Sequence, residues 1–344
     1  MKRDYWPTDE WRIAEPSSLG MDPGKLVELN RTVKDQYATV NGLMVVRKGY
    51  IVFENYYNGF KQDKPQHVAS VTKSFLSALI GLALSKGYIQ RVDQKVLSFF
   101  PEYEPAPGDI QKRLITLRHL LTMTAPMAWK KSDTTGHEPL DRLRRQRNWV
   151  QFILELLGQN GRPGAFQYST AGAHLLSAVL TRSAGMCARQ FANEHLFKPL
   201  GIREIPDYPE QGFLPDDVFG DTLKGWVHDP QGNTAGGWGL TISVRDMARF
   251  GLLYVSRGIW EGGQIIPAEW IDESWAENPH DYGYLWWLKK EGDIFVYAAL
   301  GAGGNAIYCI PEKDLVVVIA SEIILKARDR WPLMTNCILP AVTE

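Results

Sequence analysis

A serine and a lysine three residues apart are the residues whose types and spacing could do chemistry in this chain. Ser70 and Lys73 lie in the stretch Val68–Lys73, which runs directly into the apolar segment from Ser74 to Leu84. If a helix begins near Ser70, one turn brings Lys73 onto the same face, because side chains three apart are neighbours. The lysine could then take the hydroxyl proton of the serine, provided that burial lowers the lysine pKa. The pattern predicts a nucleophilic serine with a lysine base.

The segment after Lys73 predicts a helix that is buried on every side. Its apolar residues leave no polar face: they are Phe75, Leu76, Leu79, Ile80, Leu82 and Leu84. Free backbone N–H groups at the start of such a helix would point at an oxyanion forming near Ser70. A serine and a lysine at this spacing also occur by accident in a chain of this length, so the hypothesis needs support from other residues.

Two further stretches could supply that support. The turn Gly161–Thr170 delivers Tyr168 just before a predicted helix, and a phenol at Ser70 and Lys73 could relay protons to a leaving group. The alternative for Tyr168 is a structural aromatic. The glycine-rich stretch 300–305 precedes a strand, whereas a phosphate loop would precede a helix. We therefore expect either a backbone N–H facing an acyl oxygen or a simple strand bend.

Other chemistries have little support in the sequence. The chain has no GxSxG, HExxH or CxxC pattern, and its seven histidines show no ligand spacing, so we expect each histidine to be a surface or core residue. His228, in a glycine-rich loop, is the histidine that we keep as a possible pocket residue. Three widely spaced cysteines fit a reduced compartment better than a disulfide framework.

The charge and hydropathy of the chain exclude several kinds of partner. Its 38 lysines and arginines oppose 39 aspartates and glutamates, which gives a net charge of −1. Such a balance predicts binding to neither nucleic acid nor an anionic membrane. No apolar run reaches the length of a membrane helix, and no apolar segment follows the first charged residues. We expect a cytoplasmic protein that acts on a small molecule; its oligomeric state is left open.

The order of elements predicts an α+β fold. Strand patterns stand at both ends of the chain, in a hairpin about Lys48-Gly49 and in four runs after residue 283, with mostly helical segments between them. We expect one antiparallel sheet built from both termini and flanked by helices, with a helical region inserted. The predicted sheet domain comprises residues 1–75 and 283–344, the helical domain comprises residues 76–282, and the active site lies in the groove between them.

Taken together, the three stretches resemble motifs of the serine β-lactamase and penicillin-binding-protein superfamily, in particular its class C-like esterases and the amide hydrolases related to 6-aminohexanoate-dimer hydrolase. Ser70 to Lys73 match the SxxK element, Tyr168-Ser169-Thr170 the YxN-type element, and Gly301-Ala302-Gly303 the position of the KTG strand. The resemblance implies an acyl-enzyme on Ser70, with Lys73 as base and Tyr168 as the acid that protonates the leaving group. It also implies an oxyanion hole made by the backbone N–H groups of Ser70 and Ala302, without metal or cofactor.

Two departures from the family pattern bear on the substrate. Gly301-Ala302-Gly303 carries no charge or side-chain donor for a substrate carboxylate, and Thr170 replaces the usual asparagine. A small carboxylic ester or linear amide is therefore the expected substrate. The alternatives are a β-lactamase or D-Ala-D-Ala carboxypeptidase activity, and a non-catalytic binding module of the same fold. The predicted substrate-binding residues are Thr170, Gly301, Gly303, Asn305, Trp129, Trp238 and His228.

Overall fold

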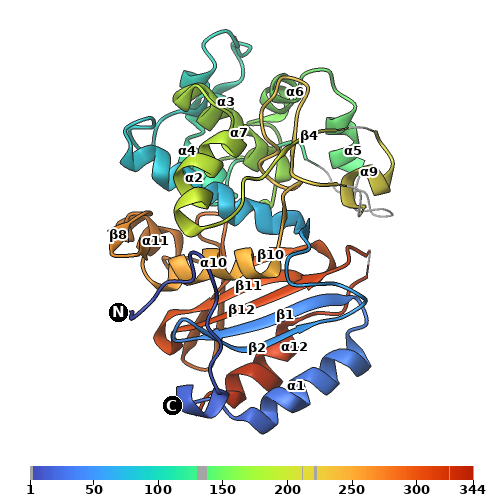
Figure 1. Ribbon diagram of the computed structural model, residues 1–344. Helices are drawn as coiled ribbons and strands as arrows, with labels where there is room; N and C mark the ends of the chain where they lie inside the picture. The colour runs from blue at the N-terminus through green and yellow to red at the C-terminus, as the bar shows by residue number, and fades with distance from the viewer. Residues whose placement is uncertain (1–2, 130–137, 211, 221–222, 325, 344) are drawn as a thin grey trace.

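A six-stranded antiparallel sheet forms the centre of the computed structural model, which describes residues 3–129, 138–210, 212–220, 223–324 and 326–343. The strand order is β2-β1-β12-β11-β10-β9, so strands from the two ends of the chain pair in the middle of the sheet (Figure 1). The strands are β1 (Val40–Arg47), β2 (Tyr50–Tyr56), β9 (Trp287–Glu291), β10 (Ile294–Gly301), β11 (Asn305–Ile310) and β12 (Leu315–Ser321). The predicted α+β fold and its two-terminus sheet are confirmed; the domain boundaries stay a prediction.

The predicted hairpin turn joins β1 to β2. Lys48 and Gly49 both have positive φ, 51° and 88°, which suits a two-residue hairpin connection. The edge strand β9 begins at Trp287, three residues later than the predicted start at Tyr284. Leu285 adopts a φ of 60°, and its N–H donates to the carbonyl of Leu121 instead of to a neighbouring strand. The chain is therefore tied to the helical region until it reaches Trp287.

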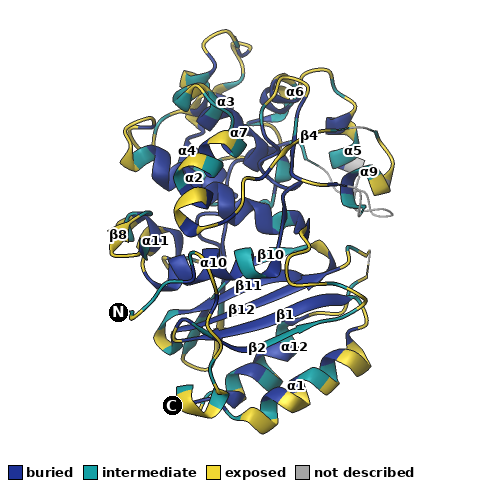
Figure 2. Cartoon of the chain, viewed as in Figure 1, coloured by how far each residue is buried: buried dark blue, intermediate teal, exposed yellow. Residues whose placement is uncertain are grey.

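Helices cover both faces of the sheet. On one face lie α1 (Pro23–Gln36) and the C-terminal α12 (Trp331–Leu333), which continues as helical turns to Ala341 and closes a second hydrophobic core (Figure 1). On the other face lies α10 (Val244–Val255), whose Gly251 packs directly onto Val316 and Ile307. The central strands β1, β11 and β12 are buried at every residue, whereas the edge strands β2 and β9 are partly exposed (Figure 2).

The remaining helices gather beyond α10 around α2 (Thr72–Ser85), which packs against α7 (Thr170–Ala184) (Figure 1). The other helices there are α3 (Ile110–Leu114), α4 (Leu117–Leu121), α5 (Glu138–Arg144), α6 (Trp149–Leu156), α8 (Ala188–Ala192), α9 (Pro215–Phe219) and α11 (Ala268–Ser274). Short strands connect them: β3 (Gln66–His67), β4 (Asp207–Pro209), β5 (Trp226–His228), β6 (Thr241–Ile242), β7 (Ile259–Trp260) and β8 (Gly263–Gln264). All residues of α2 from Thr72 to Ala83 are buried, as the apolar run predicted.

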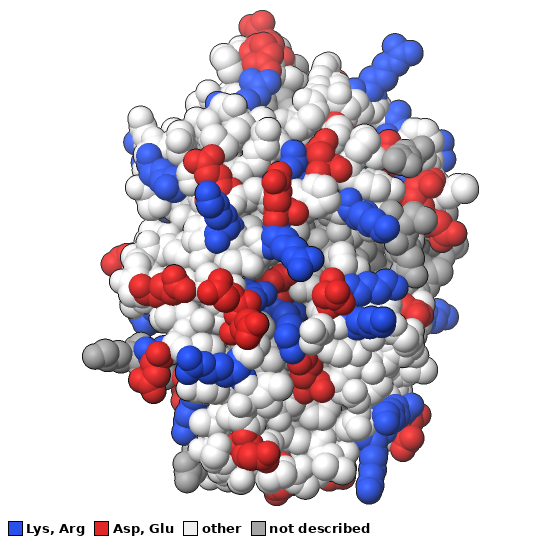
Figure 3. Space-filling view, viewed as in Figure 1, with Lys and Arg blue, Asp and Glu red and all other residues white. Residues whose placement is uncertain are grey.

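The surface carries both signs of charge side by side. Figure 3 shows lysine and arginine interspersed with aspartate and glutamate over the visible face, without a large area of one sign. Among the described residues, no helix is long and apolar enough to cross a bilayer.

Candidate active site

Ser70 sits in a short 3₁₀ turn, Ala69–Val71, that leads directly into α2. Ala69 adopts a φ of 49°, which is uncommon for a residue other than glycine. The Ala69 carbonyl accepts a hydrogen bond from Thr72 Oγ1 at 2.6 Å, and its N–H donates to His67 Nδ1 at 3.1 Å. Ser70 is partly exposed, while its neighbours on both sides are buried. The turn therefore leaves Ser70 partly open to solvent, while hydrogen bonds to Ala69 fix the backbone beside it.

Lys73 lies one turn after Ser70 and is 1 % exposed. Its Nζ donates to Ser70 Oγ at 2.8 Å and to the backbone carbonyl of Gly237 at 2.9 Å. Burial lowers the pKa of Lys73 to about 7, because the charged ammonium loses its hydration. A large share of the amine is thus neutral near pH 7 and can accept a proton from the hydroxyl that it touches.

The Gly237 carbonyl was not predicted as part of the site. The segment 236–239 packs so closely against α2 and α7 that a Cβ on Gly237 would lie 3.2 Å from Lys73 Nζ and 2.7 Å from Thr170 Cγ2. Only glycine brings its backbone this near to the amine. The sequence signal was the Gly236-Gly237-Trp238-Gly239 stretch itself, but its pairing with Lys73 spans 164 residues.

Tyr168 approaches Ser70 from the turn before α7. Burial raises the pKa of the phenol to about 12, and a hydrogen bond with Ser70 opposes that rise. The Lys73 amine lies 5.0 Å from the centre of the Tyr168 ring. Ser70, Lys73 and Tyr168 thus lie together, with a phenol that is neutral at neutral pH.

The end of β10 lies against the Ser70 turn. A Cβ on Gly301 would meet the carbonyl oxygen of Val68 at 2.4 Å and the backbone nitrogen of Ser70 at 3.2 Å, so the strand approaches only because residue 301 is glycine. Ala302 follows and is exposed. Gly303 has a φ of 78° and is buried beneath the carbonyl of Glu322. The backbone of the glycine-rich loop, and not its side chains, therefore faces the Ser70 turn.

Asn305 does not fit its predicted role in substrate binding. The residue is fully buried, and its Nδ2 donates to the carbonyls of Ala302 and Ser321 at 2.8 and 3.1 Å. Its Oδ1 accepts from Gln66 Nε2 at 2.7 Å and from the Ser321 N–H at 2.9 Å. All of its hydrogen-bonding groups are used to fix the loop around Ala302, so none is left for a ligand.

Trp238 and His228 also lie away from the reacting groups. Trp238 is 3 % exposed and stacks on Trp149 at 5.4 Å between ring centres, as part of the main core. His228 Nδ1 contacts the Asp229 carbonyl at 2.7 Å, and its Nε2 lies 3.3 Å from Asp207. These contacts join β5 to β4. Both residues were predicted to line the pocket, and both instead serve local packing.

Thr170 and Trp129 complete the predicted set. Thr170 is the first residue of α7, half-buried, and turns its methyl group toward Gly237 beside Lys73. Trp129 packs partly buried against the main core and borders residues 130–137, which lie outside the described part of the chain. A substrate contact by Trp129 stays a prediction.

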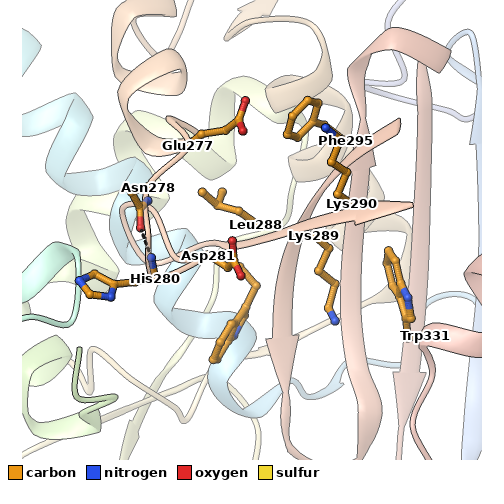
Figure 4. Close-up of a pocket in the computed structure, with 10 residues that line it drawn as sticks. Glu277, Asn278, His280, Asp281, Leu288, Lys289, Lys290, Phe295 and Trp331 are labelled. Atoms are coloured by element: carbon orange, nitrogen blue, oxygen red, sulfur yellow. Dashed lines mark hydrogen bonds between the residues drawn. The ribbon is translucent and has the colours of Figure 1, made fainter. Parts of the chain in front are cut away.

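An aromatic group beside Tyr168, which was missed in the sequence, leads to a pocket. Trp287 stacks on Tyr168 with ring centres 5.7 Å apart, and Tyr282 and Phe166 stand edge-on or tilted around Trp287. Trp287 also lines a pocket of about 590 Å³. Figure 4 shows the other walls of this pocket: Glu277, Asn278, His280, Asp281, Leu288, Lys289, Lys290, Phe295 and Trp331. The stack between Trp287 and Tyr168 thus connects this pocket to the group around Ser70.

The site carries no metal-binding signature. Within the described ranges, no group of three or more histidine, cysteine, aspartate or glutamate side chains could hold a metal ion. The chemistry that this arrangement supports depends on a hydroxyl, an amine, a phenol and backbone N–H groups.

Comparison with known proteins gives a consistent result. The family model described as Beta-lactamase matches residues 29–324. The 6-aminohexanoate-dimer hydrolase of Paenarthrobacter ureafaciens is 21% identical over 306 residues, which cover 82% of this chain and 72% of that protein. The solved structure of a putative 6-aminohexanoate-dimer hydrolase from Bacillus anthracis aligns with a TM-score of 0.72 at 18% identity, over 96% of this chain and 86% of that one. The structure of EstCE1, a hydrolase with promiscuous acyltransferase activity, aligns with a TM-score of 0.68 at 18% identity, over 93% and 98%.

Proposed function

The chain belongs to the Beta-lactamase family, and from that premise we propose that it is a serine hydrolase that forms an acyl-enzyme through Ser70 and acts on small carboxylic esters or linear amides. The observation that carries the proposal is the 2.8 Å contact between Ser70 Oγ and the amine of a lysine whose pKa burial lowers to about 7. Relatives named as a dimer hydrolase and as a hydrolase with acyltransferase activity support the same class of reaction.

Acylation begins with proton transfer from Ser70 to the neutral Lys73 amine. Ser70 Oγ forms a bond to the substrate carbonyl carbon, whose oxygen becomes an oxyanion. The backbone N–H groups of Ser70 and Ala302, on the turn and at the end of β10, are proposed to donate to that oxyanion. The Gly237 carbonyl accepts a hydrogen bond from the ammonium that forms on Lys73. This bond fixes the orientation of the ammonium toward Ser70.

Collapse of the tetrahedral intermediate breaks the bond to the leaving group, which needs a proton. Tyr168 donates its phenolic proton to the departing oxygen or nitrogen, and the resulting phenolate then takes the proton that Lys73 carries. Water then enters, the neutral Lys73 amine takes its proton, and the hydroxide attacks the acyl carbon. As the bond to Ser70 Oγ breaks, the proton returns from Lys73 to that oxygen, which releases the acid and restores Ser70.

The substrate class follows from what faces the nucleophile. Gly301 and Ala302 offer backbone but no cation to bind a carboxylate next to the scissile bond, which disfavours β-lactams and D-Ala-D-Ala peptides. The aromatic group of Trp287, Tyr282 and Phe166 provides apolar contact beside Tyr168. A small ester or linear amide with an apolar portion fits this combination.

Hydrolysis of a short-chain p-nitrophenyl ester by the wild type and by Ser70→Ala tests the proposal, together with intact-mass spectrometry after a fluorophosphonate. We expect turnover and one adduct on Ser70 in the wild type, and neither in Ser70→Ala. The variant should unfold at nearly the wild-type temperature, because the hydroxyl is partly exposed and its removal opens no core cavity.

A chromogenic cephalosporin, assayed in parallel, tests the alternative substrate class. Cephalosporin hydrolysis faster than ester hydrolysis would replace the proposed substrate while keeping the nucleophile. A folded wild type that is inert and unlabelled would contradict the proposal and favour a binding module.

A further inference from the structure

His67 is buried between the nucleophile turn and the segment 236–239. It belongs to β3, which pairs with β6 so that His67 lies opposite Thr241, and it is 6 % exposed. Its Nδ1 faces the backbone N–H of Ala69 at 3.1 Å, and its Nε2 faces the backbone N–H of Gly239 at 3.0 Å. One ring therefore contacts the residue before Ser70 and the segment whose carbonyl holds Lys73.

Each of these two backbone groups lies in a stretch that depends on contacts from outside it. Ala69 holds a positive φ of 49°, a conformation that persists only where surrounding contacts fix it. The segment 236–239 has a side chain only at Trp238, which packs on Trp149 and on His174 of α7, so its three glycines depend on contacts to their backbone. Hydrogen bonds to its backbone therefore carry much of its placement.

The ring cannot accept from both donors at once. A neutral imidazole has one N–H and one acceptor nitrogen, so one of the two backbone N–H groups is bonded and the other meets an N–H, whichever tautomer is present. Protonation offers no relief, since it would add a second N–H. Burial lowers the pKa of His67 to about 3, so the ring stays neutral over the working range. The Ser70 turn and the Gly239 segment thus share a single acceptor.

We propose that His67 is a positioning residue of the Ser70 centre, which ties the Ala69–Ser70 turn to the segment 236–239 and so keeps Ser70 Oγ and the Gly237 carbonyl on the same Lys73 amine. This inference rests on the proposed function. Without the ring, the segment 236–239 moves off Lys73 and water reaches the amine. The pKa of Lys73 then rises toward its ordinary value, and less neutral base is present at pH 7.

Three substitutions of His67 separate its contacts. In His67→Asn the amide oxygen lies near the place of Nδ1, toward Ala69; in His67→Gln it can reach the place of Nε2, toward Gly239; His67→Phe fills the volume without an acceptor. The matched control is His195→Asn, because His195 is a partly buried histidine packed on Phe191, outside the site. For each variant we would measure the unfolding temperature, kcat and KM on the p-nitrophenyl ester, and the rate of fluorophosphonate labelling against pH.

We expect His67→Phe to label about a hundredfold more slowly than the wild type, with a loss in kcat and a KM within about threefold. The acidic limb of its pH profile should move to higher pH. His67→Asn or His67→Gln should label at least about tenfold faster than His67→Phe. The faster of the two identifies whether the contact to Ala69 or the contact to Gly239 matters more. His195→Asn should behave as the wild type. A merely structural role would lower the unfolding temperature without moving the acidic limb.

Wild-type labelling rates and an unmoved acidic limb in the folded His67 variants would overturn the positioning role. If His67→Phe does not fold, the acidic limb of the labelling pH profile in His67→Asn and His67→Gln tests the positioning role in the same way. A folded wild type that takes up no fluorophosphonate at Ser70 would instead overturn the proposed function, a failure visible before any His67 variant is made.

Discussion

The two sides of Ser70 differ in their surroundings. On one side, Lys73 is enclosed by its own helix, by the Gly237 carbonyl and by Thr170, all close to backbone that glycine allows to approach. On the other side, Tyr168 is half-buried and stacks on Trp287, which itself lines an open pocket (Figure 4). The lysine side is therefore closed, whereas the tyrosine side borders a pocket through Trp287.

The same physical cause acts on both sides with opposite results. Burial disfavours the charged form of each group, which is a cation for lysine and an anion for tyrosine. The pKa of Lys73 therefore falls to about 7, while that of Tyr168 rises to about 12. Between these values both groups are neutral, so that one can accept a proton and the other can donate one. The difference between the two sides thus sets a pH window for catalysis.

Removing the proposed base, Lys73, should lower activity more than any other change to the two sides of Ser70. We expect Lys73→Met to slow fluorophosphonate labelling of Ser70 by about 10³-fold, within the range of general base catalysis. Its unfolding temperature should stay the same or rise, because a buried amine gives way to an apolar chain of similar length. Lys86→Met, at the exposed end of α2, is the matched control and should keep full activity. A labelling rate within tenfold of the wild type would show that Lys73 is not the base.

The pH dependence should show the lysine side directly. Because Lys73 must be neutral, kcat/KM should fall about tenfold per pH unit below a pKa of about 7, or about a hundredfold two units below it. In the unfolded chain the lysine stays protonated up to its ordinary pKa of 10.5, so the unfolded state binds more protons between these values. The free energy of unfolding should therefore rise with pH across this window in the wild type, by more than in Lys73→Met. Equal slopes in the two proteins would contradict the lowered pKa.

On the tyrosine side, the loss of kcat/KM in Tyr168→Phe should depend on the leaving group of the substrate. We expect Tyr168→Phe to reduce kcat/KM about a hundredfold for alkyl esters and amides, whose leaving groups need a proton. The loss for p-nitrophenyl esters should be much smaller, because p-nitrophenolate departs without one. Steady-state rates on the two kinds of substrate measure the difference. Equal losses on both would assign Tyr168 to positioning Ser70 rather than to protonation.

The smallest effect is expected at the pocket wall. Trp287→Leu removes the ring that stacks on Tyr168 and faces the pocket, so KM should rise a few-fold with kcat nearly unchanged. Trp6→Leu, which removes a ring packed on Trp260 outside this pocket, serves as the control and should leave both constants unchanged. A kcat loss in Trp287→Leu as large as that of Tyr168→Phe would mean that the stack holds the phenol in place.

Local patterns in the sequence predicted helices and strands well where the spacing of apolar residues fits one kind of element. The wholly apolar run after Lys73 became a helix buried from Thr72 to Ala83, and the β-rich runs around Lys48-Gly49 became a hairpin. The same reasoning failed for residues chosen by proximity to a motif. Trp238 follows the glycines of its motif, yet its ring turns into the core, and Asn305 follows the glycine-rich loop, yet its amide fixes that loop. Adjacency in sequence does not say which way a side chain points.

The sequence by itself determined the Ser70–Lys73 pair, because three residues of helix fix that distance locally, and it determined the burial of the helix that carries them. The tertiary structure decided what surrounds the pair. The Gly237 carbonyl, the end of β10 at Gly301 and the ring of Trp287 come from segments more than 160 residues away along the chain. Their approach depends on the absence of a Cβ at single glycines and on contacts such as those of His67, which exist only once the sheet and the helices have packed together.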